Sequence, residues 1–532
     1  MFVRRIFRVI MLAPVGVGLA AAPASAQSPV VVTGKSPGFD VIALNEGGVA
    51  KAIRELPDMV RAVMARSQTP GVAVAVVQNG KTAYVEGFGV RRLGEAGAIT
   101  PETVFQIASM SKPMSATIAA IAVSQGKVSW SDPVRQRLPW FRLKDPWVSD
   151  HATIGDFFAH RSGLPHAAGD NLEDLGFSRQ EILSRLDQWP LDPFRASYNY
   201  ANFGTTVAAE AVAAAMGEEW ESLAARLLFT PLGMNATSAR HADFLARQNR
   251  ASLHALVGGR FQPLYDRDPD AQSPAGGVSS NVRDVAEWLK LLLAGGTHGG
   301  KRLFDADKLT PALTAQITPH APSSPDERSS FYGYGFNVGV HANGRTNFGH
   351  SGAFLLGAGT CFQILPSANL GVVVLTNGAP VGAAEAIVSQ FMDIAQYGVS
   401  TRDWYAGYHQ MMQPMFAPVG DLAGATPPAH PAPAKPLAAY AGVYDNSYFG
   451  PVEIVARGGG LQLQIGPKRK TALLTHWNGD AFAMAPPSGE SEPEGSRSSV
   501  RFEMQGDQAK GLVINYLDDA GLGRWKRQGK TP

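Results

Sequence analysis

Two side chains one helical turn apart have the chemistry of a nucleophile and its base. Ser109 and Lys112 occupy positions i and i+3 of the stretch Ser109-Met110-Ser111-Lys112. On a helix these side chains share one face, and the lysine amine can take the hydroxyl proton while the oxygen attacks a carbonyl carbon. The spacing therefore predicts covalent catalysis in which Ser109 carries an acyl group.

A second stretch of the same form makes the position of the helix end decisive. Ser124-Gln125-Gly126-Lys127 has the same spacing. Pro113 lacks an amide hydrogen and fits only the first turn of a helix, so the helix should begin near Ser109 and place its positive end beside that hydroxyl. Ser124, close to a glycine, is expected at the opposite end. We therefore favour Ser109, although a residue before proline disfavours helical angles and Lys112 should begin the helix imperfectly.

A phenol and an amide follow in the stretch Tyr200-Ala201-Asn202. The phenol can carry a proton if cationic neighbours lower its pKa, and the amide can bind the carbonyl side of a substrate. Tyr444-Asp445-Asn446 has the same form, and a tyrosine on a loop is more often a packed surface residue than an acid or base. Taken alone, this pattern leaves both interpretations open.

The third candidate is His350-Ser351-Gly352, which we expect just before a strand that begins near Ala353. An edge strand can align an acyl substrate and offer backbone amides as an oxyanion hole. His298-Gly299-Gly300 is similar, but it follows a helical run that ends near Leu293, where a solvated turn is the better interpretation.

The elements that must position these residues alternate between helix and strand. Residues 49–63 have helical apolar spacing, and the strands expected at 72–77 and 82–85 are joined through Asn79-Gly80, a strong hairpin signal. Residues from about 125 to 325 are mainly helical, including 208–215 and 285–293. Strands are expected at 332–340, 353–365 and 370–375, before a helix that ends at Gly398. This order predicts an α+β domain with a helical insertion.

A proline-rich segment at 417–436 divides the chain. Before it, residues 47–416 form the expected hydrolase domain, which follows a lead-in at 27–46. After it, residues 437–532 show period-two alternation, as in Leu461, Leu463 and Ile465, which predicts a small all-β domain.

The first 26 residues are typical of a secretion signal. Arg4, Arg5 and Arg8 precede an apolar run at residues 9–22, and Ala24-Ser25-Ala26 offers a small-residue cleavage site. We expect export to the periplasm or medium, with no stable membrane span after cleavage.

Composition excludes some other roles. The 47 basic and 45 acidic residues nearly cancel, so nothing favours a nucleic-acid partner. The single cysteine, Cys361, excludes an internal disulfide and is expected to be a buried hydrophobe.

In this order, Ser109-x-x-Lys112, Tyr200-x-Asn202 and His350-x-Gly352 resemble the three motifs of the serine β-lactamase and penicillin-binding-protein superfamily. The closer resemblance is to its class C β-lactamase, D-alanyl-D-alanine carboxypeptidase, D-aminopeptidase and esterase branch. Three further stretches are similar to the same branch, so the likeness spans roughly residues 48 to 400: His160-Arg161-Ser162-Gly163-Leu164-Pro165, residues 274–280 and residues 331–335.

This resemblance implies an antiparallel sheet flanked by helices, a helical subdomain beside it, and a cleft between them. The C-terminal domain similarly resembles a small lipocalin-like barrel. Ser109 would be the nucleophile, while Lys112 and Tyr200 would exchange its proton. No metal and no cofactor are implied.

The resemblance also assigns the binding residues. Asn202 would orient the acyl group, and His350 would position substrate or tune the region of Tyr200. Gly352 belongs to the third motif, and the amides of Ser109 and Ala353 would form the oxyanion hole.

One departure bears on the substrate. True β-lactamases usually begin the third motif with lysine, and His350 replaces that fixed cation with a group largely neutral near pH 7. We therefore expect a hydrolase of peptides or amides, including those of D-amino acids, ahead of esters and then of β-lactams. A non-catalytic binder or sensor of cell-wall peptides is the alternative from another class.

Two other hydrolase types receive no support. Gly34-Lys35-Ser36-Pro37-Gly38 matches Gly-x-Ser-x-Gly, but Pro37 lacks the amide that an oxyanion hole needs after the nucleophile. The zinc-peptidase pattern His-Glu-x-x-His does not occur in the sequence.

Overall fold

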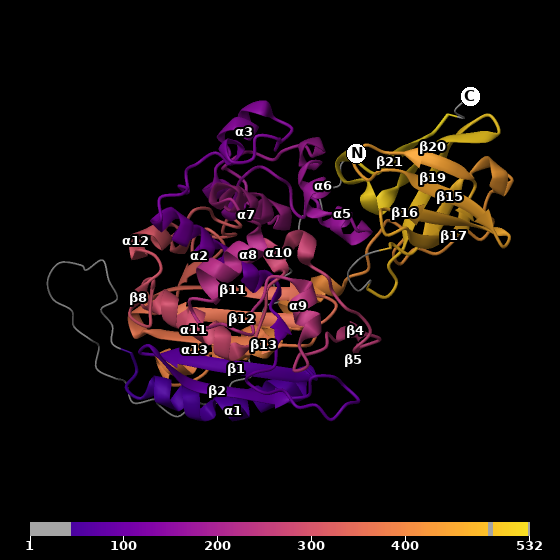
Figure 1. The fold of residues 1–532 in the computed structure, drawn as a ribbon. Helices are drawn as coiled ribbons and strands as arrows, with labels where there is room; N and C mark the ends of the chain where they lie inside the picture. Colours follow the sequence, from indigo (N-terminus) through magenta and orange to yellow (C-terminus); the bar gives the residue numbers. More distant parts are fainter. Residues whose placement is uncertain (1–43, 488–492, 530–532) are drawn as a thin grey trace. The chain divides into compact units, whose positions relative to one another are not determined.

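The computed structural model describes residues 44–487 and 493–529 (Figure 1). The predicted signal peptide and the Gly34-to-Gly38 match lie outside the described residues. Within them, no helix combines the length and apolar character that a membrane crossing requires.

A seven-stranded antiparallel sheet lies at the centre of the N-terminal part, in the order β2-β1-β13-β12-β11-β10-β9. Strand β1 pairs with both β2 and β13, which joins the beginning of the described chain to a segment about 300 residues later. The strands are β1 Gly71–Gln78, β2 Lys81–Gly89, β9 Phe331–Tyr332, β10 Asn337–Val340, β11 Thr346–Phe354, β12 Ala358–Leu365 and β13 Leu370–Thr376.

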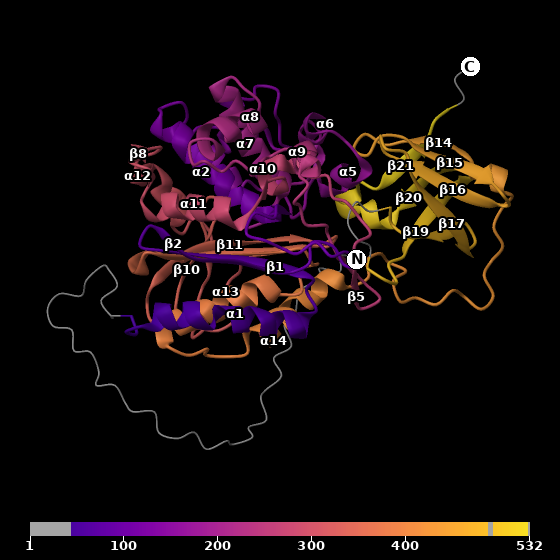
Figure 2. The same ribbon diagram turned by 60° about the horizontal axis from the view of Figure 1, so that its bottom comes forward.

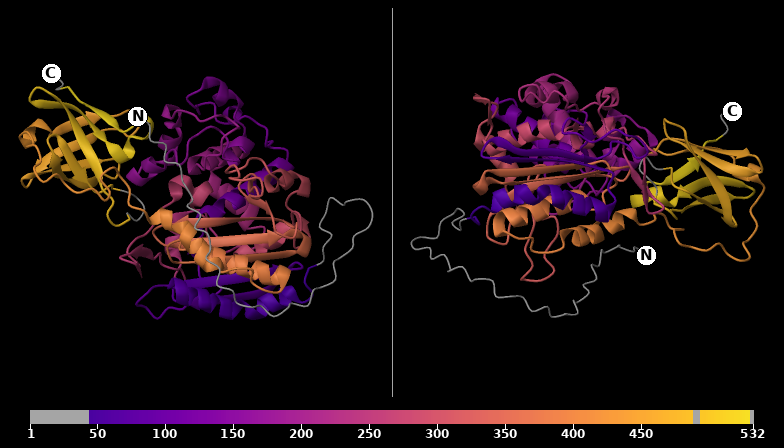
Figure 3. Two further views of the ribbon diagram at one scale, coloured as in Figure 1. Left: turned by 180° about the vertical axis from the view of Figure 1, so that it is seen from behind. Right: turned by 90° about the horizontal axis from the view of Figure 1, so that it is seen from below.

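Helices cover both faces of this sheet. On one face lie α1 (Gly48–Ser67), α13 (Ala383–Tyr397) and α14 (Trp404–Met412), with α1 and α13 side by side (Figures 2 and 3). Strand β1 is buried on both sides, because Val72, Val74 and Val76 pack in this layer while Ala73, Ala75 and Val77 face the other. The predicted hairpin is confirmed: Asn79 and Gly80 both adopt positive φ, 51° and 74°, as a type I′ turn requires.

The opposite face carries a larger helical layer, which holds α2 (Ser111–Ser124), α7 (Asn202–Met216) and α11 (Val282–Leu293). Its shorter helices are α3 Pro146–His151, α4 Ile154–Phe158, α5 Asp170–Leu175, α6 Arg179–Leu183, α8 Trp220–Ala224, α9 His241–Ala246, α10 Ser273–Gly276 and α12 Ala306–Leu309. Three small two-stranded sheets lie outside the central sheet: β3 Phe105–Gln106 with β6 Ser279–Ser280, β4 Ala255–Val257 with β5 Arg260–Gln262, and β7 Thr297–His298 with β8 Lys301–Arg302.

Two segments expected as single strands are each divided in the structure. The expected strand at 353–365 is a hairpin of β11 and β12, which turns at Gly357 with φ 136°. The expected strand at 332–340 breaks between β9 and β10, where Gly335 has φ 76° and a Cβ at Gly333 would lie 1.9 Å from the Ala312 carbonyl oxygen. In both segments a glycine, Gly357 or Gly335, turns the chain at a point where the apolar pattern predicts a continuous strand.

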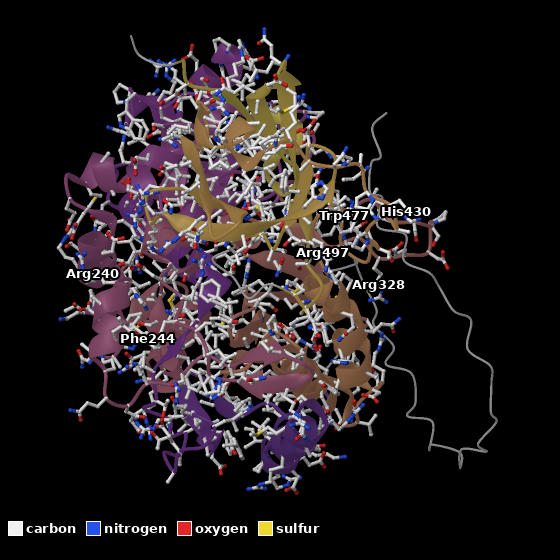
Figure 4. All side chains as sticks on the ribbon, turned by 90° about the vertical axis from the view of Figure 1, so that its right-hand side faces the viewer. Arg240, Phe244, Arg328, His430, Trp477 and Arg497 are labelled. Carbon is white, nitrogen blue, oxygen red and sulfur yellow. The ribbon has the colours of Figure 1, made fainter. Side chains whose placement is uncertain are left out.

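The C-terminal part is a closed eight-stranded barrel, which confirms the predicted all-β fold. Leu461, Leu463 and Ile465 are buried inside the barrel, as their alternation predicts. On the same domain, the Arg497 guanidinium lies 5.7 Å from the centroid of the Trp477 ring (Figure 4). Its strands are β14 Gly442–Asp445, β15 Val452–Arg457, β16 Gly460–Ile465, β17 Lys470–Asn478, β18 Ala481–Met484, β19 Ser498–Gln505, β20 Gln508–Ile514 and β21 Arg524–Arg527. Residues 417–436 contain neither helix nor strand.

Candidate active site

Ser109 lies where a tight turn leads into α2. A single 3-10 turn, Ala108–Met110, precedes the helix, and Pro113 occupies the first turn of α2. Ala108 is fully buried at φ 48°, a left-handed conformation that costs a non-glycine residue about 1 kcal/mol. Ser124 is instead the last residue of α2. The helix therefore presents its positive end to Ser109 and its negative end to Ser124, as the sequence predicts.

The Lys112 amine has three oxygen partners. Its Nζ atom lies 3.1 Å from Ser109 Oγ, 2.7 Å from Asn202 Oδ1 and 3.0 Å from the Ala275 carbonyl oxygen. The side chain is completely buried, and this burial lowers the pKa of Lys112 to about 7 although the nearby Asp170 charge opposes the shift. The amine is therefore substantially neutral near pH 7, the form that accepts a proton.

The Ala275 carbonyl is held against Lys112 by two serines on α2. Ser115 Oγ donates to the Pro274 carbonyl oxygen at 2.6 Å, and Ser111 Oγ accepts from the Val278 amide at 3.0 Å. Residues 274–280, which the sequence singled out only for their similarity to the family, thus pack along the helix and supply a backbone acceptor to the base.

Tyr200 lies over the same amine, with its ring centroid 4.5 Å from Lys112 Nζ. The sequence made proton transfer by this phenol conditional on cationic neighbours that lower its pKa. Burial instead raises the pKa of Tyr200, and a hydrogen bond with the Ser109 side chain only partly opposes that effect. The phenol is therefore protonated at neutral pH. The rings of His160 and Tyr198 pack around this region, and His160 lies 4.5 Å from Tyr200 between centroids.

Asn202 is the first residue of α7, and both ends of its amide have protein partners. Oδ1 accepts from Lys112, and Nδ2 donates to Asp170 Oδ2 at 3.1 Å. The Asn202 amide thus links the Lys112 amine to the Asp170 carboxyl group, and its expected role toward the substrate acyl group stays a prediction.

His350 lies inside β11, which corrects the expectation that its motif precedes the strand. Nδ1 lies 2.5 Å from the Ser351 carbonyl oxygen, which can only accept, so this nitrogen carries the proton and Nε2 accepts from the Tyr332 hydroxyl at 2.9 Å. Burial and the Lys112 charge lower the pKa of His350 to about 3. The imidazole is neutral and offers no cation to a carboxylate.

Gly352 brings β11 close to the nucleophile. A Cβ at this position would lie 3.0 Å from the Ser109 amide nitrogen, 2.3 Å from the Ile107 carbonyl oxygen and 2.4 Å from Thr360 Oγ1. Strand β12 pairs with β11 as far as Phe354, whereas β10 pairs only with residues 346–349. Among the described strands, residues 350–354 therefore have a neighbour on one side, and Ala353 lies on this open edge next to the serine.

Replacing Gly352 with alanine should force β11 away from residues 107–109. Two of the three atoms that the new methyl group would meet belong to the backbone, so the clash cannot be relieved by a rotamer change. We expect Gly352→Ala to lower stability by about 1–3 kcal/mol and hydrolytic turnover by at least about 10-fold, measured by thermal unfolding and ester hydrolysis.

Gly339→Ala in β10 is the matched control, because its Cβ would meet only the Asn347 side chain, at 3.4 Å or more. Equal activity in the two variants would contradict the close approach of β11 to Ser109.

Asp170 and Tyr332 touch the candidate site but were not identified from the sequence. Asp170 is the first residue of α5, where an acidic residue usually indicates only a helix start. Tyr332 lies in a stretch that similarity had marked, but its contact with His350 depends on the pairing of strands. The two stretches that share the form of the second and third motifs lie outside this site. His298 is in the β7–β8 hairpin beside Glu287, and Tyr444 is in the barrel.

No group of three or more histidine, cysteine, aspartate or glutamate side chains in the described part of the chain is arranged to hold a metal ion. Cys361 is buried in β12, as predicted.

Comparisons with known proteins bear on the family and the fold of this chain. The β-lactamase family profile matches residues 56–395, and the profile of a domain of unknown function (DUF3471) matches residues 426–521. An unguisins hydrolase of Aspergillus campestris is 25% identical over 421 residues, covering 75% of this chain and 76% of that protein.

Penicillin-binding protein 4 of Amycolatopsis lactamdurans is 25% identical, over 72% of this chain and 95% of its own length. Among solved structures, the octameric penicillin-binding protein homologue from Pyrococcus abyssi aligns with a TM-score of 0.56 at 18% identity, covering 89% of this chain and 99% of that one. This last likeness supports the fold.

Proposed function

Because this chain belongs to the β-lactamase family, we propose that it is a serine hydrolase that cleaves peptide, amide or ester bonds through an acyl-enzyme on Ser109. The observation that carries the proposal is the convergence of the Ser109 hydroxyl with the Lys112 amine at 3.1 Å and with the Tyr200 phenol. A nucleophile within reach of a buried amine and a phenol has the parts that acyl transfer needs.

In the acylation step, neutral Lys112 takes the hydroxyl proton of Ser109 while Oγ attacks the substrate carbonyl carbon. The negative charge that develops on the carbonyl oxygen is stabilised by the amides of Ser109 and Ala353 and by the positive end of α2. The Tyr200 phenol donates its proton to the leaving group as the carbon–nitrogen or carbon–oxygen bond breaks. Tyr200 then recovers a proton from Lys112, which returns the amine to its neutral form. In deacylation the same groups act in reverse, with water attacking the acyl carbon and Ser109 Oγ leaving.

The charges around the site favour substrates other than β-lactams. A β-lactam carries a carboxylate, and the neutral His350 does not supply the cation that the usual lysine of the third motif would provide. A relative that is named a hydrolase supports a hydrolytic reaction. Peptides or amides, including those of D-amino acids, are our first expectation for the substrate. Ester hydrolysis is the second expectation, because the same steps apply to a better leaving group.

A labelling experiment with a substrate panel tests the proposal. The protein is incubated with a fluorophosphonate, the adduct is located by mass spectrometry, and turnover is measured on D-amino peptides, short esters and a chromogenic cephalosporin. We expect one adduct, on Ser109, and faster turnover of amides or esters than of the cephalosporin. A protein that remains unlabelled and inactive would support a non-catalytic binder of cell-wall peptides instead.

We also propose that the protein acts outside the cytoplasm. This proposal rests on the arginine-led apolar segment and small-residue cleavage site within residues 1–26.

A further inference from the structure

The Asp170 carboxylate lies one hydrogen bond beyond the residues that the three motifs name. Its Oδ2 atom accepts from Asn202 Nδ2 at 3.1 Å. Its Oδ1 atom is buried and has no hydrogen-bond partner among the described residues. Gly169, at φ 97°, turns the chain so that α5 begins at this residue. The mechanism above gives Asp170 no part.

When Lys112 is protonated and Asp170 is ionised, the amide of Asn202 satisfies its neighbours in one orientation only. Its oxygen must face Lys112, which has only donors when protonated, and its NH₂ group must then face Asp170. In the flipped orientation, the amide NH₂ would meet the lysine N–H groups and the amide oxygen would meet the carboxylate. Asp170 is therefore the group that holds the Asn202 oxygen toward the base.

The oxygen of Asn202 in turn sets the direction of the Lys112 lone pair. A neutral amine has two N–H bonds, and two carbonyl oxygens, those of Asn202 and Ala275, lie within hydrogen-bond range of Nζ. With both hydrogens donated to these oxygens, the lone pair is left for the third neighbour, the Ser109 hydroxyl at 3.1 Å. This is the orientation in which Lys112 can accept the serine proton.

We propose that Asp170 is a positioning residue for the catalytic base, which acts through Asn202 to aim the Lys112 lone pair at Ser109. The inference rests on the proposed acyl-enzyme function. It implies that the rate of acylation depends on Asp170, an acidic residue outside the three motifs.

The charge of Asp170 affects the pKa of Lys112, which a pH–rate profile can measure. Burial raises the pKa of Asp170 and lowers that of Lys112, and each group's charge favours the charged form of the other. Glu173 and Asp174 on the same helix add to the upward shift of the Asp170 pKa. The phenols of Tyr200 and Tyr448 also lie within the field of this carboxylate.

The test compares Asp170→Ala with Asp170→Asn in the full chain, using the rate constant for fluorophosphonate labelling of Ser109 and kcat and KM for a neutral ester. We expect Asp170→Ala to slow labelling at least about 10-fold and to lower kcat with little change in KM, because the base loses its orientation. Asp170→Asn should restore the rate to within about 3-fold, since its carbonyl oxygen can still accept from Asn202. In both variants the acid limb of the pH profile should move to lower pH, because the carboxylate no longer favours protonated Lys112.

Asp174→Asn alters a neighbouring acidic residue of the same helix and leaves the Asp170–Asn202 hydrogen bond in place, so it should label at nearly the wild-type rate. The final labelling stoichiometry reports the folded fraction, so a loss of folding in Asp170→Ala is separated from a loss of rate. If that variant does not fold, the pH limb of Asp170→Asn decides. Wild-type labelling kinetics and an unmoved acid limb in the Asp170 variants would overturn the inference, whereas an unlabelled wild-type protein would overturn the proposed function itself.

Discussion

Ser109→Ala should lower turnover of every substrate by at least about 10³-fold and abolish the covalent adduct. The proposed mechanism transfers the acyl group to the Ser109 hydroxyl oxygen, which lies 3.1 Å from the Lys112 amine at the positive end of α2. Removing one partly buried oxygen atom should leave the fold intact. Steady-state kinetics and intact-protein mass spectrometry after fluorophosphonate treatment measure both effects.

Ser124→Ala is the matched control for this variant. Ser124 has the same sequence spacing to a lysine, but it lies at the other end of α2, where its hydroxyl accepts from the Asp305 amide at 3.1 Å. We expect its loss to cost about 1 kcal/mol of stability and no activity. A Ser109→Ala protein that kept its turnover would end the acyl-enzyme proposal, whatever the control shows.

The second large effect concerns the base. Since burial holds the pKa of Lys112 near 7, the amine is protonated below that pH and neutral above it. The value of kcat/KM for a neutral ester should therefore rise with pH through about 7 and then level, because only the neutral amine accepts the serine proton. Lys112→Met should lower kcat by about 10²–10⁴-fold. It should also remove the rise of kcat/KM with pH near 7, the acid limb of the profile.

A neutral ester is chosen so that the substrate does not titrate, and rates are corrected for spontaneous hydrolysis. Lys127→Met, which alters the lysine of the other Ser-x-x-Lys stretch, should keep both the rate and the limb. If the wild-type rate instead rose only near pH 10, the usual range of a lysine, the buried amine would be excluded as the base.

The position of the α2 helix start, on which the choice of Ser109 as the proposed nucleophile depends, could be predicted because it is set by local chemistry. Pro113 restricts the position of the helix start, and the helix start decides between Ser109 and Ser124. The hairpin at Asn79 and Gly80, the helices and the alternating strands of the barrel are likewise encoded within short windows. For these elements local preference and tertiary structure agree.

Other features depend on contacts between distant segments. Nothing near Lys112 in the sequence shows that the carbonyl of Ala275 will face its amine or that burial will bring its pKa to about 7. The β11–β12 turn was missed because apolar residues continue on both sides of Gly357, and periodicity alone does not indicate where a run reverses. Asp170 was missed because its partner, Asn202, lies 32 residues later and is brought to it only by the tertiary structure.

The one-sided pairing of β11 at residues 350–354 has a consequence for molecular recognition. An extended acyl donor placed along that margin would join the sheet as a guest strand, held through its main-chain amides and carbonyls. Recognition of this kind depends on the backbone of the guest more than on its side chains. The hydrogen bonds lie in the plane of the sheet, whereas successive side chains of a strand point to its two opposite faces. A guest with a methylated amide nitrogen would lose a donor at this margin, whereas many changes of side chain would be accepted.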